Sequence, residues 1–165
     1  MPGVTEVAGS ADGWGITVAS LRLDPDPVLL APAAPVEVFD AALAGLVAGM
    51  FPVMRLLNGV GLAAVQVGVP LRVFVYEADG VSGAMVNPVV IQRWSPYHPD
   101  EGCLSVPGRL YRPLRHRRVD VAWRESDGSS RRAVFEGLLA EIVEHEVDHL
   151  DGVLLHRRPQ APLDA

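Results

Sequence analysis

The sequence predicts one α+β domain over residues 1–165, with short, largely antiparallel strands around a C-terminal helix. Residues 71–78 (LRVFVYEA) alternate in hydropathy as a strand does. Residues 119–135 hold two apolar runs on either side of the turn residues SDGS, which predicts a hairpin. Residues 137–149 place their apolar positions at helical spacing. Strands that precede a helix in this way are typical of the α+β class.

The other elements follow in chain order. Residues 1–20 are rich in glycine, alanine and serine, so we expect a loosely ordered N-terminal arm. A helix is expected from Val36, because apolar residues recur at helical spacing up to Met54, and Pro52 should kink or shorten it near its end. Residues 84–94 predict a second strand interrupted by Pro88. Residues 159–165 are expected to form a flexible tail.

The composition excludes several classes of function. A net charge of −6 argues against nucleic acid as the main ligand. No apolar run approaches the ~20 residues of a membrane helix, and no basic segment precedes an apolar stretch at the N-terminus, so we expect a cytoplasmic protein that binds no membrane. The absence of lysine excludes lysine nucleophiles and lysine-anchored cofactors. The five arginines of residues 109–118 are interpreted as a solvated hairpin edge.

A candidate metal site begins with the pattern His145-Glu146-x-x-His149 in the expected C-terminal helix. Histidines four residues apart share one helix face, so both imidazoles can bind one metal while Glu146 stays beside them as a general base. An exposed polar helix face is the alternative interpretation. It is disfavoured because Leu138 and Ile142 lie on the same side as the histidines, which therefore continue an apolar stripe that faces inward.

A third ligand must come from another segment. His156 and a few acids follow His149, but they lie in or next to the expected flexible tail. Cys103, the single cysteine, lies upstream in the turn-prone segment EGCLSVPG, and a thiolate is a strong ligand for zinc or ferrous iron. Cys103, His145 and His149 leave a fourth coordination position for water, as catalysis requires.

A glycine-rich segment, residues 58–68 (NGVGLAAVQVG), carries a lone Gln66 among small apolar residues. Glycines permit close approach of the backbone to a ligand. A buried glutamine amide must find a partner, and an oxyanion is a suitable one. A plain loop that enters a strand is the alternative interpretation of this segment.

Taken together and in this order, the segments GVGLAAVQVG, EGCLSVPG and HEVDHLDG resemble the peptide deformylase family. The resemblance implies that Cys103, His145 and His149 hold one divalent metal ion, Fe²⁺ in the first place, with Zn²⁺, Ni²⁺ or Co²⁺ as substitutes. It also implies that Glu146 takes a proton from metal-bound water.

Further positions receive roles from the same resemblance. The Gln66 side chain and the backbone N–H of Leu104 are expected to hold the oxyanion together with the metal. Gly61 lies where the family lets the substrate backbone come close. Arg115 is expected to pair with Glu101 and hold the cysteine loop. The pocket for the substrate side chain is expected to be lined by Val60, Leu138, Glu141 and Ile142.

The activity implied by the resemblance is metal-dependent removal of the N-formyl group from formyl-methionyl peptides of new proteins, with release of formate. The expected partners are an N-formylated peptide and, transiently, the ribosome. A hydrolase of the same fold that acts on another N-formyl compound or small amide in a specialised pathway is the alternative. A non-catalytic metal-binding module is a third interpretation, disfavoured because it would not need Glu146 and Gln66.

Two positions of the C-terminal helix depart from the family pattern. Glu144 stands where glutamine is common, and Glu141 stands where arginine or an apolar residue is usual. Glu141 either pairs with an arginine of residues 109–118, which leaves the pocket apolar, or faces the pocket and favours a cationic or hydrogen-bonding group on the substrate. We expect the arginine pair, because an unpaired buried charge is costly.

Overall fold

The computed structural model describes residues 13–162 and confirms the α+β class. Five strands form an antiparallel sheet in the order β1-β2-β3-β6-β7. Their bounds are β1 Gly61–Ala63, β2 Val73–Ala78, β3 Val81–Tyr97, β6 Arg115–Arg124 and β7 Ser130–Glu136. A small second sheet pairs β4 (Glu101–Cys103) with β5 (Val106–Tyr111). No helix within residues 13–162 is long and apolar enough to cross a membrane.

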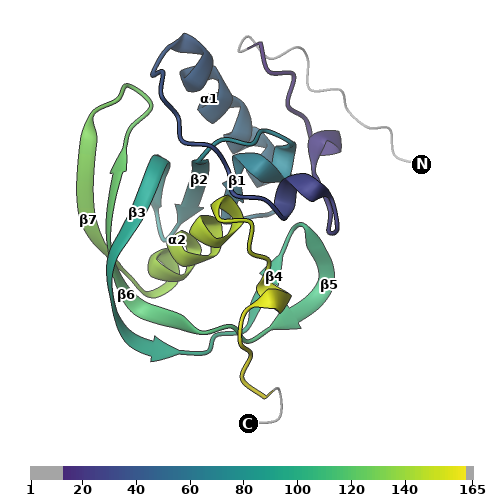
Figure 1. Cartoon of the computed structure of the whole chain (residues 1–165), viewed down its shortest axis with the longest axis vertical. Coiled ribbons are helices and arrows are strands. Elements are labelled where there is room, and N and C mark those ends of the chain that lie inside the picture. Colours follow the sequence, from purple (N-terminus) through teal and green to yellow (C-terminus); the bar gives the residue numbers. More distant parts are fainter. Residues whose placement is uncertain (1–12, 163–165) are drawn as a thin grey trace.

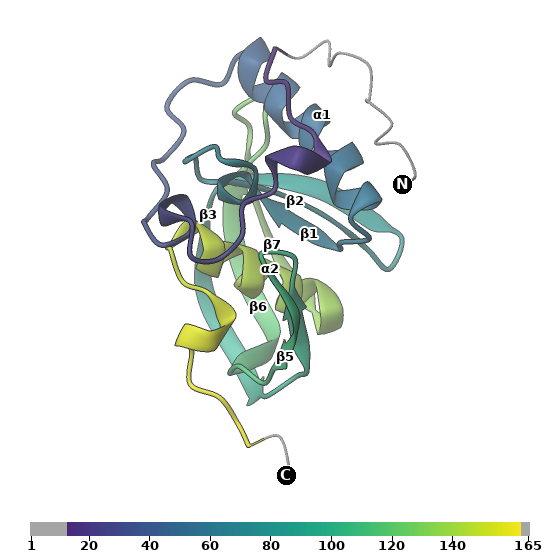
Figure 2. The same ribbon diagram turned by 90° about the vertical axis from the view of Figure 1, so that its right-hand side faces the viewer.

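Two helices cover opposite faces of the large sheet, α1 (Ala41–Leu56) and α2 (Gly137–Leu150). Figure 2 shows α1 above strands β1 and β2, with α2 below them. Alternate residues of β2 serve the two sides: Phe74 and Tyr76 join the core cluster that contains Val143 of α2, whereas Val73 and Val75 join the cluster around α1. Figure 1 shows α2 between the large sheet and the β4–β5 sheet, so one helix contacts both sheets.

Helix α1 begins five residues later than the hydrophobic pattern indicates. The side chain of Asp40 accepts a hydrogen bond from the backbone N–H of Leu43 at 3.0 Å, which caps the helix and places its first residue at Ala41. The expected start at Val36 is therefore wrong. The helix continues past Pro52 and ends at Leu56, because a proline near the C-terminal end removes only one hydrogen bond of the helix.

Strand β3 is longer than the expected segment 84–94 and runs through Pro88. Its pairing with β6 shifts register between Val86 and Val89, so the missing N–H of Pro88 falls at an irregularity of the ladder. Asn87 has a positive φ of 50° there, and its side-chain amide bonds both the N–H and the carbonyl of Val36 at 2.8 Å. The expected hairpin of residues 119–135 is confirmed as β6 and β7.

Both ends of the described chain are attached to the body of the protein. The indole of Trp14 donates to the carbonyl of Ala42 at 2.7 Å. The side chain of Gln160 donates to the carbonyl of Leu155 at 2.7 Å and accepts from the N–H of Arg112 at 2.7 Å. Composition alone does not reveal these tertiary contacts of residues 13–20 and 159–162. The remaining parts of the expected arm and tail, 1–12 and 163–165, lie outside the described residues.

Candidate active site

The three expected metal ligands converge where α2 passes β4. His145 and His149 lie one turn apart on α2, with their ring centroids 5.0 Å apart. Cys103 is the last residue of β4, and its Sγ lies 3.3 Å from Nε2 of His149, although 46 positions separate the two residues in the chain. One ligand atom from each of the three residues lies within 4.8 Å of the others.

Strand β4 is held to α2 by a buried network of charges. Glu101 accepts two hydrogen bonds from Arg115, at 2.7 and 3.0 Å, as the sequence led us to expect. Oε2 of Glu101, which accepts the longer of these bonds, also lies 2.8 Å from Nδ1 of His145. Arg115 is 1% exposed and also donates to Asp148 at 2.7 Å. A carboxylate behind a histidine fixes the ring and leaves its second nitrogen free to bind a metal.

The charges of this network shift the pKa values of its members. Burial raises the pKa of Glu101, but hydrogen bonds from His145 and Arg115 outweigh burial and bring it below its usual range. Burial lowers the pKa of His145, yet its contacts with Cys103 and Glu101 raise it well above the ordinary value. Burial and the charge of His145 lower the pKa of His149, so that imidazole is neutral, as a metal ligand must be.

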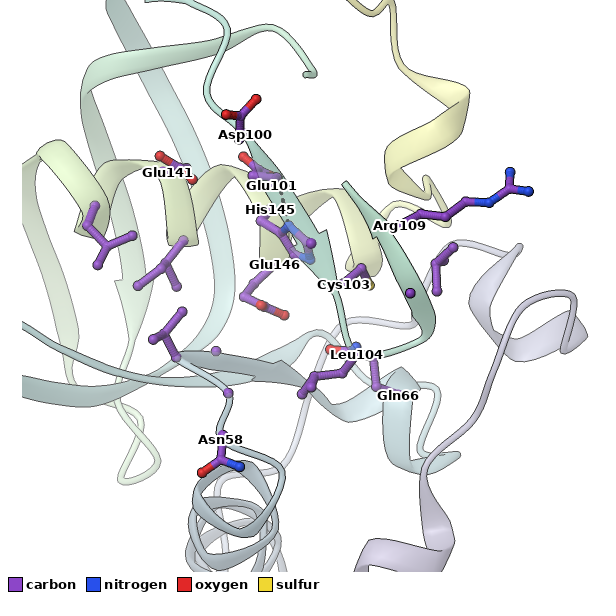
Figure 3. A pocket seen from close by; sticks show the side chains of 18 residues that line it. Asn58, Gln66, Asp100, Glu101, Cys103, Leu104, Arg109, Glu141, His145 and Glu146 are labelled. Carbon is purple, nitrogen blue, oxygen red and sulfur yellow. Dashed lines mark hydrogen bonds and ion pairs between the residues drawn. The ribbon is translucent and has the colours of Figure 1, made fainter. Parts of the chain in front are cut away.

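A pocket of about 390 Å³ opens in front of the expected ligands. Figure 3 shows His145 and Cys103 on one side of it and Glu146 pointing from α2 into it. Expected site residues from three segments of the chain meet on its walls: Val60, Gly61, Gln66, Cys103, Leu104, Leu138, Glu141, Ile142, His145 and Glu146. His149 lies behind them and is 1% exposed. The structure therefore brings together every residue that the sequence assigned to the site.

Glu146 is buried beside the expected metal ligands, and one oxygen of its carboxylate makes no hydrogen bond within the described residues. Its side chain is 4% exposed, and its Oε2 atom has no hydrogen-bond partner within the described chain. Burial raises the pKa of Glu146 to about 7. A carboxyl group in this state can take up and release a proton near neutral pH.

Gln66 is oriented by two hydrogen bonds. Its Oε1 accepts from the N–H of Ala63 at 2.9 Å, and its Nε2 donates to Oγ of Ser105 at 3.1 Å. An amide nitrogen carries two N–H groups, so one remains for a ligand in the pocket. Leu104 follows Cys103 in the turn between β4 and β5 and is drawn next to Gln66 in Figure 3.

Gly61 leaves room for Glu146. A Cβ atom added at Gly61 would lie 2.5 Å from Oε1 of Glu146 and 3.0 Å from Cγ2 of Ile142. No side chain fits there without moving the carboxylate. The missing side chain of Gly61 thus leaves space that the Glu146 carboxylate already uses in part.

The two unusual glutamates of α2 occupy different environments. Glu144 is 6% exposed and bonds to Nε of Arg93 at 3.0 Å and to the N–H of His116 at 2.7 Å, so it ties α2 to the sheet. Glu141 lines the pocket and accepts a hydrogen bond from the hydroxyl of Tyr97 at 2.8 Å. The arginine pair expected for Glu141 is therefore wrong: its partner is a neutral phenol.

Sequence reasoning missed Tyr97, Ser105 and Asp148. Tyr97 comes from the end of β3, beyond the segment that hydropathy marked as a strand. Ser105 lies within EGCLSVPG but carries no pattern of its own. Asp148 lies between Glu146 and His149 in the sequence. An acidic residue directly before a predicted metal ligand was a signal that could have identified it.

The donor set fits a divalent metal. One thiolate and two imidazoles suit zinc or ferrous iron and leave an open coordination position. Nδ1 of His145 is taken by a carboxylate, the usual arrangement behind a metal-binding histidine. The unpartnered Oε2 of Glu146 beside them suits a residue that acts on water or substrate at the site.

A model of the polypeptide deformylase family matches residues 18–162 of the chain. The peptide deformylase of Acidothermus cellulolyticus is 47% identical over 141 residues, which cover 84% of this chain and 77% of that protein. Peptide deformylase 1 of Corynebacterium efficiens is 41% identical over 148 residues, which cover 87% of this chain and 88% of that protein.

Solved structures agree with the sequence comparison. The peptide deformylase of Thermotoga maritima superposes with a TM-score of 0.83 at 36% identity, covering 86% of this chain and 97% of its own. The peptide deformylase of Synechococcus elongatus, solved in complex with actinonin, gives a TM-score of 0.82 at 34% identity, covering 87% of this chain and 80% of its own. Sequence, fold and the convergence of the ligands agree, and the chain belongs to the peptide deformylase family.

Proposed function

We propose that this chain is a metal-dependent hydrolase that removes the N-formyl group from formyl-methionyl peptides of new proteins in the cytoplasm and releases formate. The observation that carries the proposal is the convergence of Cys103, His145 and His149 beside the buried carboxylate of Glu146 in one pocket. Relatives named peptide deformylase, at 41–47% identity over most of the chain, support the same reaction.

Cys103, His145 and His149 would hold one divalent metal ion. We propose Fe²⁺, and the same donors suit Zn²⁺, Ni²⁺ or Co²⁺. When bound, such an ion polarises a carbonyl oxygen and lowers the pKa of water. The remaining chemistry falls to the residues of the chain.

Glu146 moves the protons in this proposal. It accepts a proton from the attacking water, whose oxygen bonds to the formyl carbon. It then gives that proton to the nitrogen of the peptide as the C–N bond breaks, so that the amine and formate leave. A pKa of about 7 suits both transfers, because the group can be a base in one step and an acid in the next.

Gln66 and Leu104 hold the oxyanion. The Gln66 amide is oriented before substrate arrives, since Ala63 and Ser105 fix its two ends. The remaining N–H of Gln66 and the backbone N–H of Leu104 are then available to charge that develops on the formyl oxygen. Preoriented donors of this kind typically contribute ~10²–10³ in kcat each.

Apolar walls next to the reacting group accept the side chain of the formylated residue. Ile142 is buried, whereas Val60 and Leu138 are 45% and 40% exposed and form the rim of the pocket. Glu141 completes this set and is the one charged member.

Formate release tests the proposal directly. Iron-loaded protein, purified without oxygen, is expected to release formate from formyl-Met-Ala-Ala. Glu146→Gln should keep its metal content and its fold but lose ~10²–10⁴ of turnover, the usual contribution of a positioned proton carrier. Glu136→Gln, which alters a 70% exposed side chain next to α2, is the control and should behave as the wild type. Near wild-type turnover by Glu146→Gln would overturn the assignment.

A further inference from the structure

Glu141 differs from the other carboxylates that line the pocket. Asp100 pairs with Nε of Arg112 at 2.6 Å, and Glu101 is bonded by Arg115 and His145. Glu146 has the proton-transfer role proposed above. Among the described residues Glu141 has one bonding partner, the neutral hydroxyl of Tyr97. It is the lining carboxylate whose negative charge has neither a cationic partner nor an assigned task.

Nearby arginines do not compensate this charge directly. Arg115 is occupied by Glu101 and Asp148, and the guanidinium of Arg117 lies 4.3 Å from the centroid of the Tyr97 ring instead of bonding Glu141. Arg109 lines the pocket too, but Figure 3 shows its side chain pointing away from Glu141. Burial accordingly raises the pKa of Glu141, and the negative charge of Glu101 adds to this.

The position of Glu141 places it within reach of a bound substrate. It precedes His145 by one helical turn, about 6 Å along the axis of α2. Figure 3 shows its carboxylate on the side of α2 where Asp100 and Glu101 lie, at the edge of the pocket, whereas Glu146 points to the opposite wall. A formyl group at the metal ligands would thus leave the next side chains of the substrate near Glu141.

Tyr97 keeps this carboxylate in place. Burial and the hydrogen bond to Glu141 raise the pKa of Tyr97 to about 12, so the phenol remains a donor at any ordinary pH. One oxygen of Glu141 is taken by this bond. Within residues 13–162 the other oxygen has no hydrogen-bond partner, so it is available to a donor from the substrate.

We propose that Glu141, oriented by Tyr97, favours N-formyl substrates that carry a positively charged side chain on the first or second residue after the formyl group. This inference rests on the proposed function and names the substrate class of the same site. An ammonium or guanidinium group satisfies the free oxygen and compensates the charge, which a thioether cannot do. The apolar wall of Leu138 and Ile142 is compatible with the methylene stem of a lysine or arginine.

The test compares matched substrates that differ in one charge. Formyl-Lys-Ala-Ala-amide is compared with formyl-norleucyl-Ala-Ala-amide, and formyl-Met-Lys-Ala-amide with formyl-Met-norleucyl-Ala-amide. The measured quantity is the ratio of kcat/KM within each pair. In at least one pair, Glu141→Gln should lower the lysine-to-norleucine ratio by about fivefold, as expected for one partly buried ion pair. Glutamine still accepts from Tyr97, so the fold is preserved.

Two controls isolate the effect. Asp100→Asn removes the same charge from another lining residue that Arg112 already compensates, and it should leave the ratio unchanged. High salt should shrink the wild-type ratio toward that of Glu141→Gln, since a partly exposed ion pair is screened.

The outcomes separate this inference from the proposed function. If no N-formyl substrate releases formate, the proposed function is wrong. If all four are hydrolysed and Glu141→Gln leaves both ratios unchanged, the reaction stands and the role of Glu141 is overturned. An equal change of the lysine-to-norleucine ratio in Asp100→Asn would also overturn the role of Glu141. The preference would then arise from the summed negative charge of the pocket.

Discussion

Arg158 donates from Nε to Oδ2 of Asp148 at 2.7 Å, and the same oxygen accepts from Nη1 of Arg115 at 2.7 Å. Arg115 continues to Glu101, and Glu101 to His145. A residue near the C-terminal end of the described chain is thereby joined to an expected metal ligand through four consecutive contacts between charged or ionisable groups.

Removal of Arg158 should weaken this chain of contacts. Arg158→Ala leaves Asp148 buried with one cationic partner, and we expect a loss of about 1 kcal/mol in the free energy of unfolding, kept small because Arg158 is 36% exposed. Urea unfolding of the metal-free protein measures it. Arg157→Ala, which alters the exposed neighbour, is the control. Equal losses in the two variants would contradict a specific role for Arg158.

Glu101 should make the metal-free protein sensitive to acid. Its folded-state pKa lies below the unfolded value of 4.5, so the unfolded state binds the proton more readily. Its contribution to stability is fully present above pH 4.5 and is lost as the pH falls through the folded-state pKa. Glu101→Gln should flatten this part of the profile of unfolding free energy against pH. Glu37→Gln, at an exposed position, should keep the wild-type slope.

Gly61→Ala should impair catalysis through Glu146. The added methyl group would lie 2.5 Å from Oε1 of Glu146, so the carboxylate must move. A displacement of about 1 Å in a catalytic group can cost ~10²-fold in rate. Gly102→Ala provides the contrast, because a Cβ there meets nothing closer than 3.7 Å. Steady-state formate release checks both, with unfolding curves to confirm that each variant folds.

Cys103→Ala should abolish stable metal binding. Two histidines alone are too few ligands for a catalytic zinc or iron site, so metal content should fall well below the roughly one ion per chain expected of the wild type. Elemental analysis after dialysis measures it. His156→Ala is the control, because His156 is the histidine downstream of the site. Its Nε2 lies 3.9 Å from Oδ2 of Asp24, and its removal should leave the metal content unchanged. Full occupancy in Cys103→Ala would rule out the thiolate as a ligand.

Local spacing was enough to predict the parts of the site that a single element carries. His145, Glu146 and His149 follow from the period of a helix, and the hairpin of β6 and β7 follows from alternation around a turn. Gln66 stood out as a lone amide among small apolar residues, and the resemblance added Leu104 and the pair of Glu101 with Arg115.

Contacts between distant segments were beyond the sequence. Glu141 lies 44 positions from Tyr97. The cost of an unpaired buried charge favoured an arginine partner, because the sequence does not show which side chain of a strand contacts the helix. The late start of α1 depended on the side chain of Asp40, one residue that outweighs an apolar pattern. The attachment of residues 159–162 depended on Gln160, which accepts a hydrogen bond from the N–H of Arg112, 48 positions away in the chain.

The irregularity at Asn87 and Pro88 connects sheet geometry to substrate choice. Side chains of a strand alternate between faces, so a slip of one residue beyond Asn87 would exchange Tyr97 for a neighbour that faces the other way. The amide of Asn87, bonded to the backbone of Val36, holds β3 at the first of its two register shifts against β6. A single insertion or deletion between Asn87 and Tyr97 would then release Glu141 and alter the selectivity of the enzyme, while every residue that lines the pocket kept its identity.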